Sequence, residues 1–137
     1  MTEKLETQID RYIINTEERL LAVARTAIES TVDEAQTSKF KGGKMPIKTG
    51  FLRSTGIASL NRVPSGPDRG DKKQSYIWDE GFLITILAQL KLGDIFYFGW
   101  TAVYARKQEV YNGFLAGALS NWQKNVDAAV SKFRDRK

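Results

Sequence analysis

Apolar side chains in the first quarter of the chain recur at every third or fourth position. This spacing runs from about Thr2 to Gln36 without a glycine or proline, and it is typical of one face of an α-helix. A helix of that length spans about 50 Å at 1.5 Å per residue. A compact domain of this size does not need so long a helix. We therefore expect part of it to lie against something other than its own core.

The middle of the chain changes to shorter segments that are typical of β-strands. We expect antiparallel strands within 57–63, 75–79, 82–92 and 95–100. The Gly93-Asp94 pair suits a hairpin turn between the last two of them. The leucines of 82–92 are also compatible with a helix, which leaves three to four strands in the predicted sheet.

Helical spacing returns in the last third, from about Tyr104 to Phe133. Trp122 lies in the middle of this apolar stripe, so we expect its side chain to be buried. Gly113 and Gly117 each weaken a helix by about 1 kcal/mol. They mark either a kink or a site where another backbone comes close.

Together these patterns predict a single α+β domain over residues 1–137. A hydrophobic content of 42% and a charged content of 27% are those of an ordinary soluble globular protein. The expected order is a long helix (1–36), a basic loop and hinge segment (37–56), a small antiparallel sheet with an exposed loop at 64–73 (57–100), and a long C-terminal helix packed on the sheet (104–134).

Positive charge is concentrated after the first helix. Residues 1–34 hold eight acids and four bases, whereas no acid occurs between Glu34 and Asp68. The bases in that interval are Lys39, Lys41, Lys44, Lys48, Arg53 and Arg62. Such a block favours contact with an anion, either nucleic acid or an acidic protein surface, and it is equally compatible with a solvated loop. Because 37–48 and 64–73 hold few large apolar residues, we expect both to be disordered in a free subunit.

Candidate catalytic chemistry is sparse. The chain has no cysteine and no histidine, which removes thiolate chemistry and the commonest general base and metal ligand. Asp79 and Glu80 are adjacent, so in a strand they would point to opposite faces. We expect no enzymatic activity, no cofactor and no metal. No secretory signal or membrane span is visible, so we also expect folding in a cytoplasm and no membrane contact.

The hinge segment carries the most specific local pattern. Pro46 ends the secondary-structure element that precedes it, Thr49 is a good N-cap, and Gly50 permits a close backbone approach. The segment therefore predicts one capped turn of helix followed by entry into a strand at Ile57.

Two short motifs resemble a known family. They are Pro46-x-x-Thr49-Gly50-x-Leu52-Arg53-Ser54, and Tyr104-Ala105-x-x-x-Glu109 followed by Phe114-Leu115-x-x-Ala118. Both are similar to the signature of the head–tail joining proteins of long-tailed double-stranded-DNA bacteriophages, also called neck or tail-completion proteins. The expected element order agrees with that family. The chain departs from the pattern after Glu109, where the family usually has a nearby glycine, and at Lys48, where a small acidic residue is common.

The resemblance implies a structural virion protein at the head–tail interface, assembled in the cytoplasm of a host bacterium. It would form a homo-oligomeric ring of six or twelve copies that joins the capsid connector to the tail tube. Its partners would be the adjoining connector and tail proteins, and DNA passing through the lumen. Two other functions stay open: a tail-terminator or other minor tail protein, and a small basic nucleic-acid-binding protein.

The residues most expected to matter follow from these two lines of reasoning. The resemblance assigns Pro46, Thr49, Gly50, Leu52 and Arg53 to the hinge, and Tyr104, Ala105 and Glu109 to the turn into the last helix. The charge pattern makes Lys39, Lys41, Lys44, Lys48 and Arg62 the candidates for contact with DNA or an acidic partner. For the motif residues, a purely local structural role is as compatible with the sequence as a direct contact with a partner.

Overall fold

The computed structural model describes residues 5–64 and 75–134. The exposed loop expected at 64–73 therefore lies, apart from Pro64, outside the described residues. The elements in chain order are α1 (Leu5–Gln36), the 3-10 turn η1 (Lys39–Lys41), α2 (Phe51–Ser54), β1 (Gly56–Leu60), α3 (Glu80–Ala88), β2 (Phe96–Trp100), α4 (Ala105–Asn112), α5 (Phe114–Ser120) and α6 (Trp122–Phe133).

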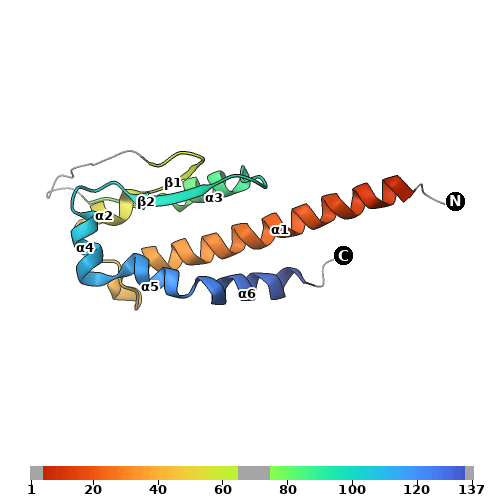
Figure 1. Cartoon of the computed structure of the whole chain (residues 1–137). Coiled ribbons are helices and arrows are strands. Elements are labelled where there is room, and N and C mark those ends of the chain that lie inside the picture. The colour runs from red at the N-terminus through yellow and green to blue at the C-terminus, as the bar shows by residue number, and fades with distance from the viewer. Residues whose placement is uncertain (1–4, 65–74, 135–137) are drawn as a thin grey trace.

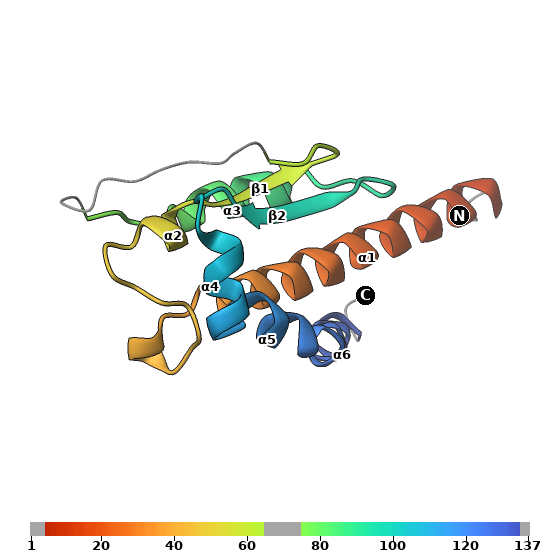
Figure 2. The same ribbon diagram turned by 60° about the vertical axis from the view of Figure 1, so that its left-hand side comes forward.

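These elements form two layers joined at one end of the molecule (Figure 1). One layer contains α1 with α5 and α6 beside it, and the other contains the two strands with α3. The α4 helix leads from the strand layer to the helical layer, as both views show (Figure 2). The fold is thus a mixture of helices with a small antiparallel sheet, in agreement with the predicted class.

The long first helix is confirmed, and its two halves differ. Ala27, Val32 and Ala35 in the C-terminal half are buried, because α5 and α6 pack on this half and Val32 packs against β1 and α3. All residues of the segment Leu5–Leu20 are exposed, and this segment projects beyond the rest of the molecule (Figure 1). No helix within residues 5–64 and 75–134 is long and apolar enough to cross a membrane.

The predicted sheet of three to four strands is wrong in its strand number, because the described residues contain a sheet of two. β1 and β2 are antiparallel, with Gly56 opposite Trp100 and Leu60 opposite Phe96. The first strand ends at Leu60 rather than at Val63, because Asn61 takes a left-handed conformation (φ 62°).

The segment expected as a strand at 82–92 begins instead with the helix α3. Asp79 caps its start by accepting a hydrogen bond from the Phe82 N–H at 3.3 Å. Arg25 of α1 caps its end by donating to the carbonyls of Leu87 (2.8 Å) and Leu90 (2.9 Å). The turn at Gly93 therefore joins a helix to β2 and is no hairpin, and 75–79 is irregular.

The single C-terminal helix expected over 104–134 is in fact three helices. Gly113 takes a left-handed conformation (φ 65°) between α4 and α5, and a second break at Asn121 precedes α6. Gly117 does not break the helix; a Cβ there would lie 2.9 Å from the Lys44 Nζ. The α5 and α6 helices pack mainly on α1, and the Phe114 ring at the start of α5 also lies edge-on to the Trp100 ring of β2 at 4.8 Å. Trp122 is 38% exposed, so its predicted burial was also wrong.

The basic loop at 37–48 has a defined conformation, contrary to the predicted disorder. The Met45 N–H donates to the Thr37 carbonyl, and the Lys39 N–H donates to the Met45 carbonyl, both at 3.1 Å. The Met45 side chain is 0% exposed. Ser38 and Met45 are the buried residues of this loop, and neighbouring elements supply their surroundings.

Candidate functional site

The two sequence motifs, about fifty residues apart in the chain, meet in one apolar cluster at the joined end of the two layers. We call it the motif cluster. Its fully buried members come from the basic loop, α2, the residues after β2 and α5: Met45, Leu52, Ala102 and Phe114. Partly buried Phe51 and Ala105 pack against them. The family-like residues are therefore parts of one structural unit.

The first motif forms the predicted turn of helix before the strand. The Thr49 hydroxyl accepts a hydrogen bond from the Phe51 N–H at 3.2 Å. Gly50 is buried with φ 84°, and a Cβ there would clash with the Tyr76 carbonyl oxygen. Leu52 is buried, and Pro46, which precedes the turn, is half-buried. A glycine is required here by both backbone conformation and space.

Arg53 is held between this turn and the segment before α3. Its guanidinium carbon lies 5.8 Å from the centre of the Trp78 ring, a cation–π distance. Its Nε is buried and has no hydrogen-bond partner within the described part of the chain. Buried donors of this kind normally have an acceptor, and the Arg53 Nε departs from this rule within the described residues.

The second motif organises the turn from α4 into α5. Tyr104 precedes α4, its ring lies 6.4 Å from the Phe51 ring, and burial raises the pKa of its hydroxyl. The Glu109 carboxylate accepts hydrogen bonds from the N–H groups of Leu115 (2.8 Å) and Ala116 (3.0 Å). These are N-terminal donors of α5, so Glu109 caps the helix that follows its own. Gly113 supplies the intervening turn.

Gln36 is a central residue that the sequence reasoning missed. Its side chain is 1% exposed, accepts from the Trp100 indole N–H and donates to the Arg53 carbonyl, both at 2.9 Å. Gly56 leaves room for it, because a Cβ there would clash with the Gln36 amide nitrogen. A polar residue at the end of an amphipathic helix gives no sequence signal for such a role.

The basic candidates divide between two places. Lys39, Lys41 and Lys44 lie on the folded loop and are exposed, as is Lys48 within the first motif. Arg62 is exposed and follows the C-terminal end of β1, which lies away from the basic loop (Figure 2). The structure therefore brings the loop lysines together and leaves Arg62 apart from them.

Three carboxylates that the sequence reasoning did not connect lie between α1 and α3. Oxygens of Glu29, Asp33 and Glu80 lie within 4.8 Å of one another. Burial, a hydrogen bond with Glu80 and the charges of Glu80 and Glu29 raise the pKa of Asp33 from 3.8 to about 7. The grouping depends on Glu80 starting a helix, which the predicted strand concealed. It makes the contact between α1 and α3 sensitive to pH.

Comparison of the chain with protein-family models, with curated proteins and with solved structures gave no match. The argument for function therefore depends on the motifs and on their geometry.

Proposed function

We propose that this protein is a structural virion subunit of a tailed bacteriophage, a component of the ring that joins the capsid connector to the tail tube. What carries the proposal is that both family-like motifs converge on one cluster. Their convergence supports the proposal, because the two motifs then form one structural unit.

The individual contacts support this proposal. Gly50 stands where only glycine fits, and Glu109 caps the next helix through two backbone N–H groups. Each of these motif residues thus has a specific structural task. We propose that the motifs shape the end of the subunit and that the half-buried guanidinium of Arg53 donates hydrogen bonds to a carboxylate of a neighbouring copy or tail protein.

In this proposal the subunit is not an enzyme and acts within a ring of six or twelve copies in the virion, after assembly in the bacterial cytoplasm. The exposed loop lysines Lys39, Lys41 and Lys44 would face DNA in the lumen or acidic surfaces of adjoining subunits. A tail-terminator position uses the same features and is separated from a neck position by the neighbours of the ring.

Deletion of the coding sequence from a phage genome that carries it tests the proposal. We expect DNA-filled heads and finished tails that remain separate in electron micrographs, with joining restored by the protein supplied from a plasmid. Particles that join normally without the protein would refute a head–tail joining role. An Arg53→Lys rescue chain, which keeps the charge but changes the guanidinium geometry, should restore joining less well than the wild type.

The clustering of the loop lysines favours a second candidate function, binding of nucleic acid by the free subunit. Binding to duplex DNA that weakens steeply with salt, and that is lost when Lys39, Lys41 and Lys44 are changed to glutamate, would support it. Arg62→Glu is the matched control, because Arg62 follows β1 and is not part of the basic loop.

A further inference from the structure

Within residues 5–64 and 75–134, two apolar surfaces lack an apolar partner. The first is the projecting part of α1, Leu5–Leu20, which we call the arm. Its exposed apolar side chains follow the spacing of one helix face: Leu5, Ile9, Tyr12, Ile13 and Leu20. The same stripe continues into Ala27 and Ala35, which the C-terminal helices cover. The arm therefore presents the same kind of apolar face by which the other half of α1 packs on its neighbours, and no described residue covers it.

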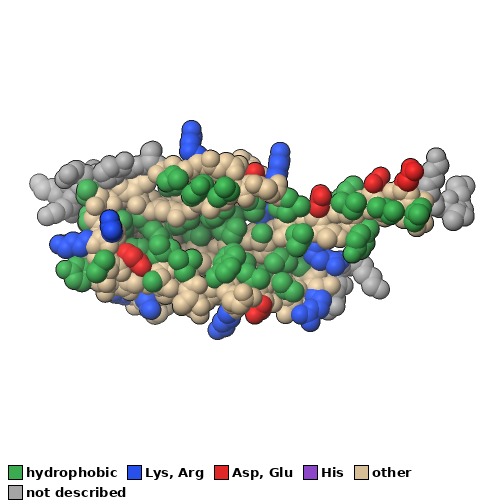
Figure 3. Space-filling view, in the orientation of Figure 1, with side chains coloured by type: hydrophobic (Ala, Val, Ile, Leu, Met, Phe, Trp, Pro, Cys, Tyr) green, Lys and Arg blue, Asp and Glu red, His purple; other side chains and the backbone are tan. Residues whose placement is uncertain are grey.

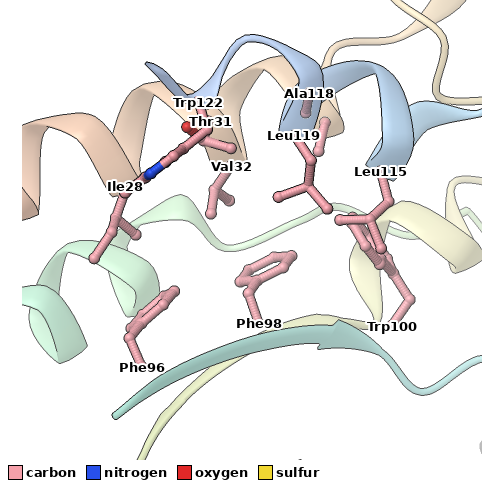
Figure 4. Close-up of a pocket in the computed structure, with 11 residues that line it drawn as sticks. Ile28, Thr31, Val32, Phe96, Phe98, Trp100, Leu115, Ala118, Leu119 and Trp122 are labelled. Atoms are coloured by element: carbon pink, nitrogen blue, oxygen red, sulfur yellow. The ribbon is translucent and has the colours of Figure 1, made fainter. Parts of the chain in front are cut away.

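The second surface is a groove between the two layers, with a volume of about 420 Å³. Figure 4 shows its side chains converging from α1, β2 and α5, and Figure 3 shows the hollow open on one face. We call it the apolar groove and define it by Ile28, Val32, Phe96, Phe98, Leu119 and Trp122. Leu119 and Trp122 are exposed at its edge.

The arm cannot fill the groove of its own chain. Ile28 and Val32, which line the groove, belong to the same straight helix as the arm. The helix contains no glycine or proline at which it could fold back, and the arm points away from the body in both ribbon views. An arm that enters such a groove must come from another molecule.

Charge identifies a second copy as a suitable partner. On the arm, Glu6, Asp10, Glu17 and Glu18 outnumber two arginines, and Figure 3 shows acidic side chains along it. Residues 37–64 and 75–134 hold twelve bases and five acids. An acidic arm and a basic body on one chain attract each other between copies, whereas two arms repel. We propose that the arm of one copy docks, through its apolar stripe, into the apolar groove of the next copy.

This contact is head-to-tail, since each copy offers a different surface to each neighbour. Such contacts close into a ring when the rotation between copies allows it. The anchors on the arm have the spacing by which amphipathic helices bind grooves elsewhere. The inference deepens the proposed function, on which it rests only for the closure into a ring.

Complementation between two variants of the full chain tests the docking. Ile9→Asp with Ile13→Asp damages the arm, and Leu119→Asp damages the groove, with Trp122→Ser as a second groove variant should Leu119→Asp fail to fold. We expect concentration-dependent self-association of the wild type in analytical ultracentrifugation, weakened about tenfold or more in each variant. A mixture of an arm variant and a groove variant should form a 1:1 pair and nothing larger, because one intact arm meets one intact groove.

Matched controls place the same charge elsewhere. Thr7→Asp with Asn15→Asp adds two acids to the arm away from its apolar stripe, and Ser120→Asp adds one beside the groove; both should associate as the wild type does. A wild type that stays monomeric at every concentration overturns the inference. So does a groove variant that associates normally, which would indicate contacts between arms.

Cysteine pairs provide a direct readout, because the natural chain has none. A chain with Ile9→Cys and a chain with Leu119→Cys should form a mixed disulfide under mild oxidation. Ile9→Cys with Ile77→Cys should not do so, although Ile77 is 92% exposed. Equal yields from the two pairs would contradict docking. Rings that still form with both surfaces damaged would overturn the docking and leave the proposed function standing. If mixed pairs form but phage joining proceeds without the protein, the docking would stand and the proposed function would be wrong.

Discussion

The two halves of α1 have one sequence pattern and opposite surroundings. Apolar residues recur at helical spacing in both halves, yet Ala27 is 1% exposed and Tyr12 is 72% exposed. The covered half contacts α3, α5 and α6, while the arm projects from the body. An apolar stripe thus predicts which face of a helix becomes buried, but it does not predict whether the same chain or another molecule buries it.

Polar groups differ between the halves in the same way. Thr31 and Gln36 in the covered half are buried and hydrogen-bonded to α6, β2 and α2. The arm carries its polar residues in solvent. Because satisfied buried polar groups fix geometry, the covered half sets the arrangement of the body. Substitutions in the two halves should therefore change different quantities: the free energy of unfolding in one, and association in the other.

The largest effect is expected for a charge placed in the covered half. Ala27→Asp puts an unpaired carboxylate between packed helices, which should lower the free energy of unfolding by about 3 kcal/mol or more. Urea unfolding followed by circular dichroism measures this. Asn15→Asp introduces the same group on the exposed arm and should stay within about 0.5 kcal/mol of the wild type. Similar losses for the two variants would contradict the distinction between the halves.

Removal of the Gln36 amide should have the next largest effect. Gln36→Ala leaves the Trp100 indole N–H and the Arg53 carbonyl without their partner and should cost about 2–3 kcal/mol. Gln36→Met keeps most of the side-chain volume and loses only the hydrogen bonds. The difference in free energy of unfolding between Gln36→Ala and Gln36→Met therefore measures the packing contribution, and the loss in Gln36→Met measures that of the hydrogen bonds. Chemical unfolding of both, beside exposed Gln123→Ala as control, gives the values. A Gln36→Ala loss no greater than that of the control would show that the buried amide is dispensable.

The helix cap at Glu109 should contribute less than the buried amide. Glu109→Ala leaves two N-terminal N–H groups of α5 without their carboxylate acceptor, at a cost of about 1–2 kcal/mol. Glu109→Gln keeps one acceptor and should retain part of that stability. Thermal unfolding of the three proteins in one buffer tests the order wild type, glutamine, alanine. An alanine variant as stable as the wild type would remove the structural reason for this motif residue.

The carboxylates between α1 and α3 should make the covered half sensitive to pH. Because the pKa of Asp33 is raised from 3.8 to about 7, the native state keeps a proton that the unfolded chain loses between those values. The contribution of Asp33 to the free energy of unfolding should therefore be greatest below about pH 4, fall as pH rises from 4 to 7, and be level above 7. Solvent screening of a half-buried group reduces this contribution to about 1 kcal/mol. Unfolding of Asp33→Asn across the same pH range should lack this slope, and an unchanged slope would assign the dependence to other groups.

Sequence patterns predicted the elements that depend on local spacing. The long first helix, the strand at 96–100 and the helical turn after Gly50 were all visible, because periodicity and backbone restrictions act within a few residues. The prediction of a strand over 82–92 failed because Asp79 caps a helix there and because Arg25, far away in the chain, caps its other end. Hydrophobic content alone does not distinguish the two structures.

The candidate site was predictable in its members and not in its assembly. The motifs named Leu52, Ala105 and Phe114, but only the fold shows that these three share one cluster. The fold also shows that Glu109 caps α5. The sequence did not predict the burial of Met45 and Gln36, because that burial depends on neighbours contributed by distant segments. The basic loop was expected to be disordered for the same reason: its own composition does not show the pocket that receives Met45.

The smallest effect on stability is expected on the arm. Tyr12→Ser removes a large apolar group, but Tyr12 contributes to no core, and tyrosine and serine have similar helix propensities. The free energy of unfolding, measured where the protein is dilute enough to be a monomer, should therefore stay within about 0.5 kcal/mol of the wild-type value. The same variant should self-associate more weakly than the wild type, because the lost side chain belongs to the proposed docking surface. A clear loss of monomer stability would mean that the arm is packed within its own chain, and the contrast between the two halves of α1 would then be wrong.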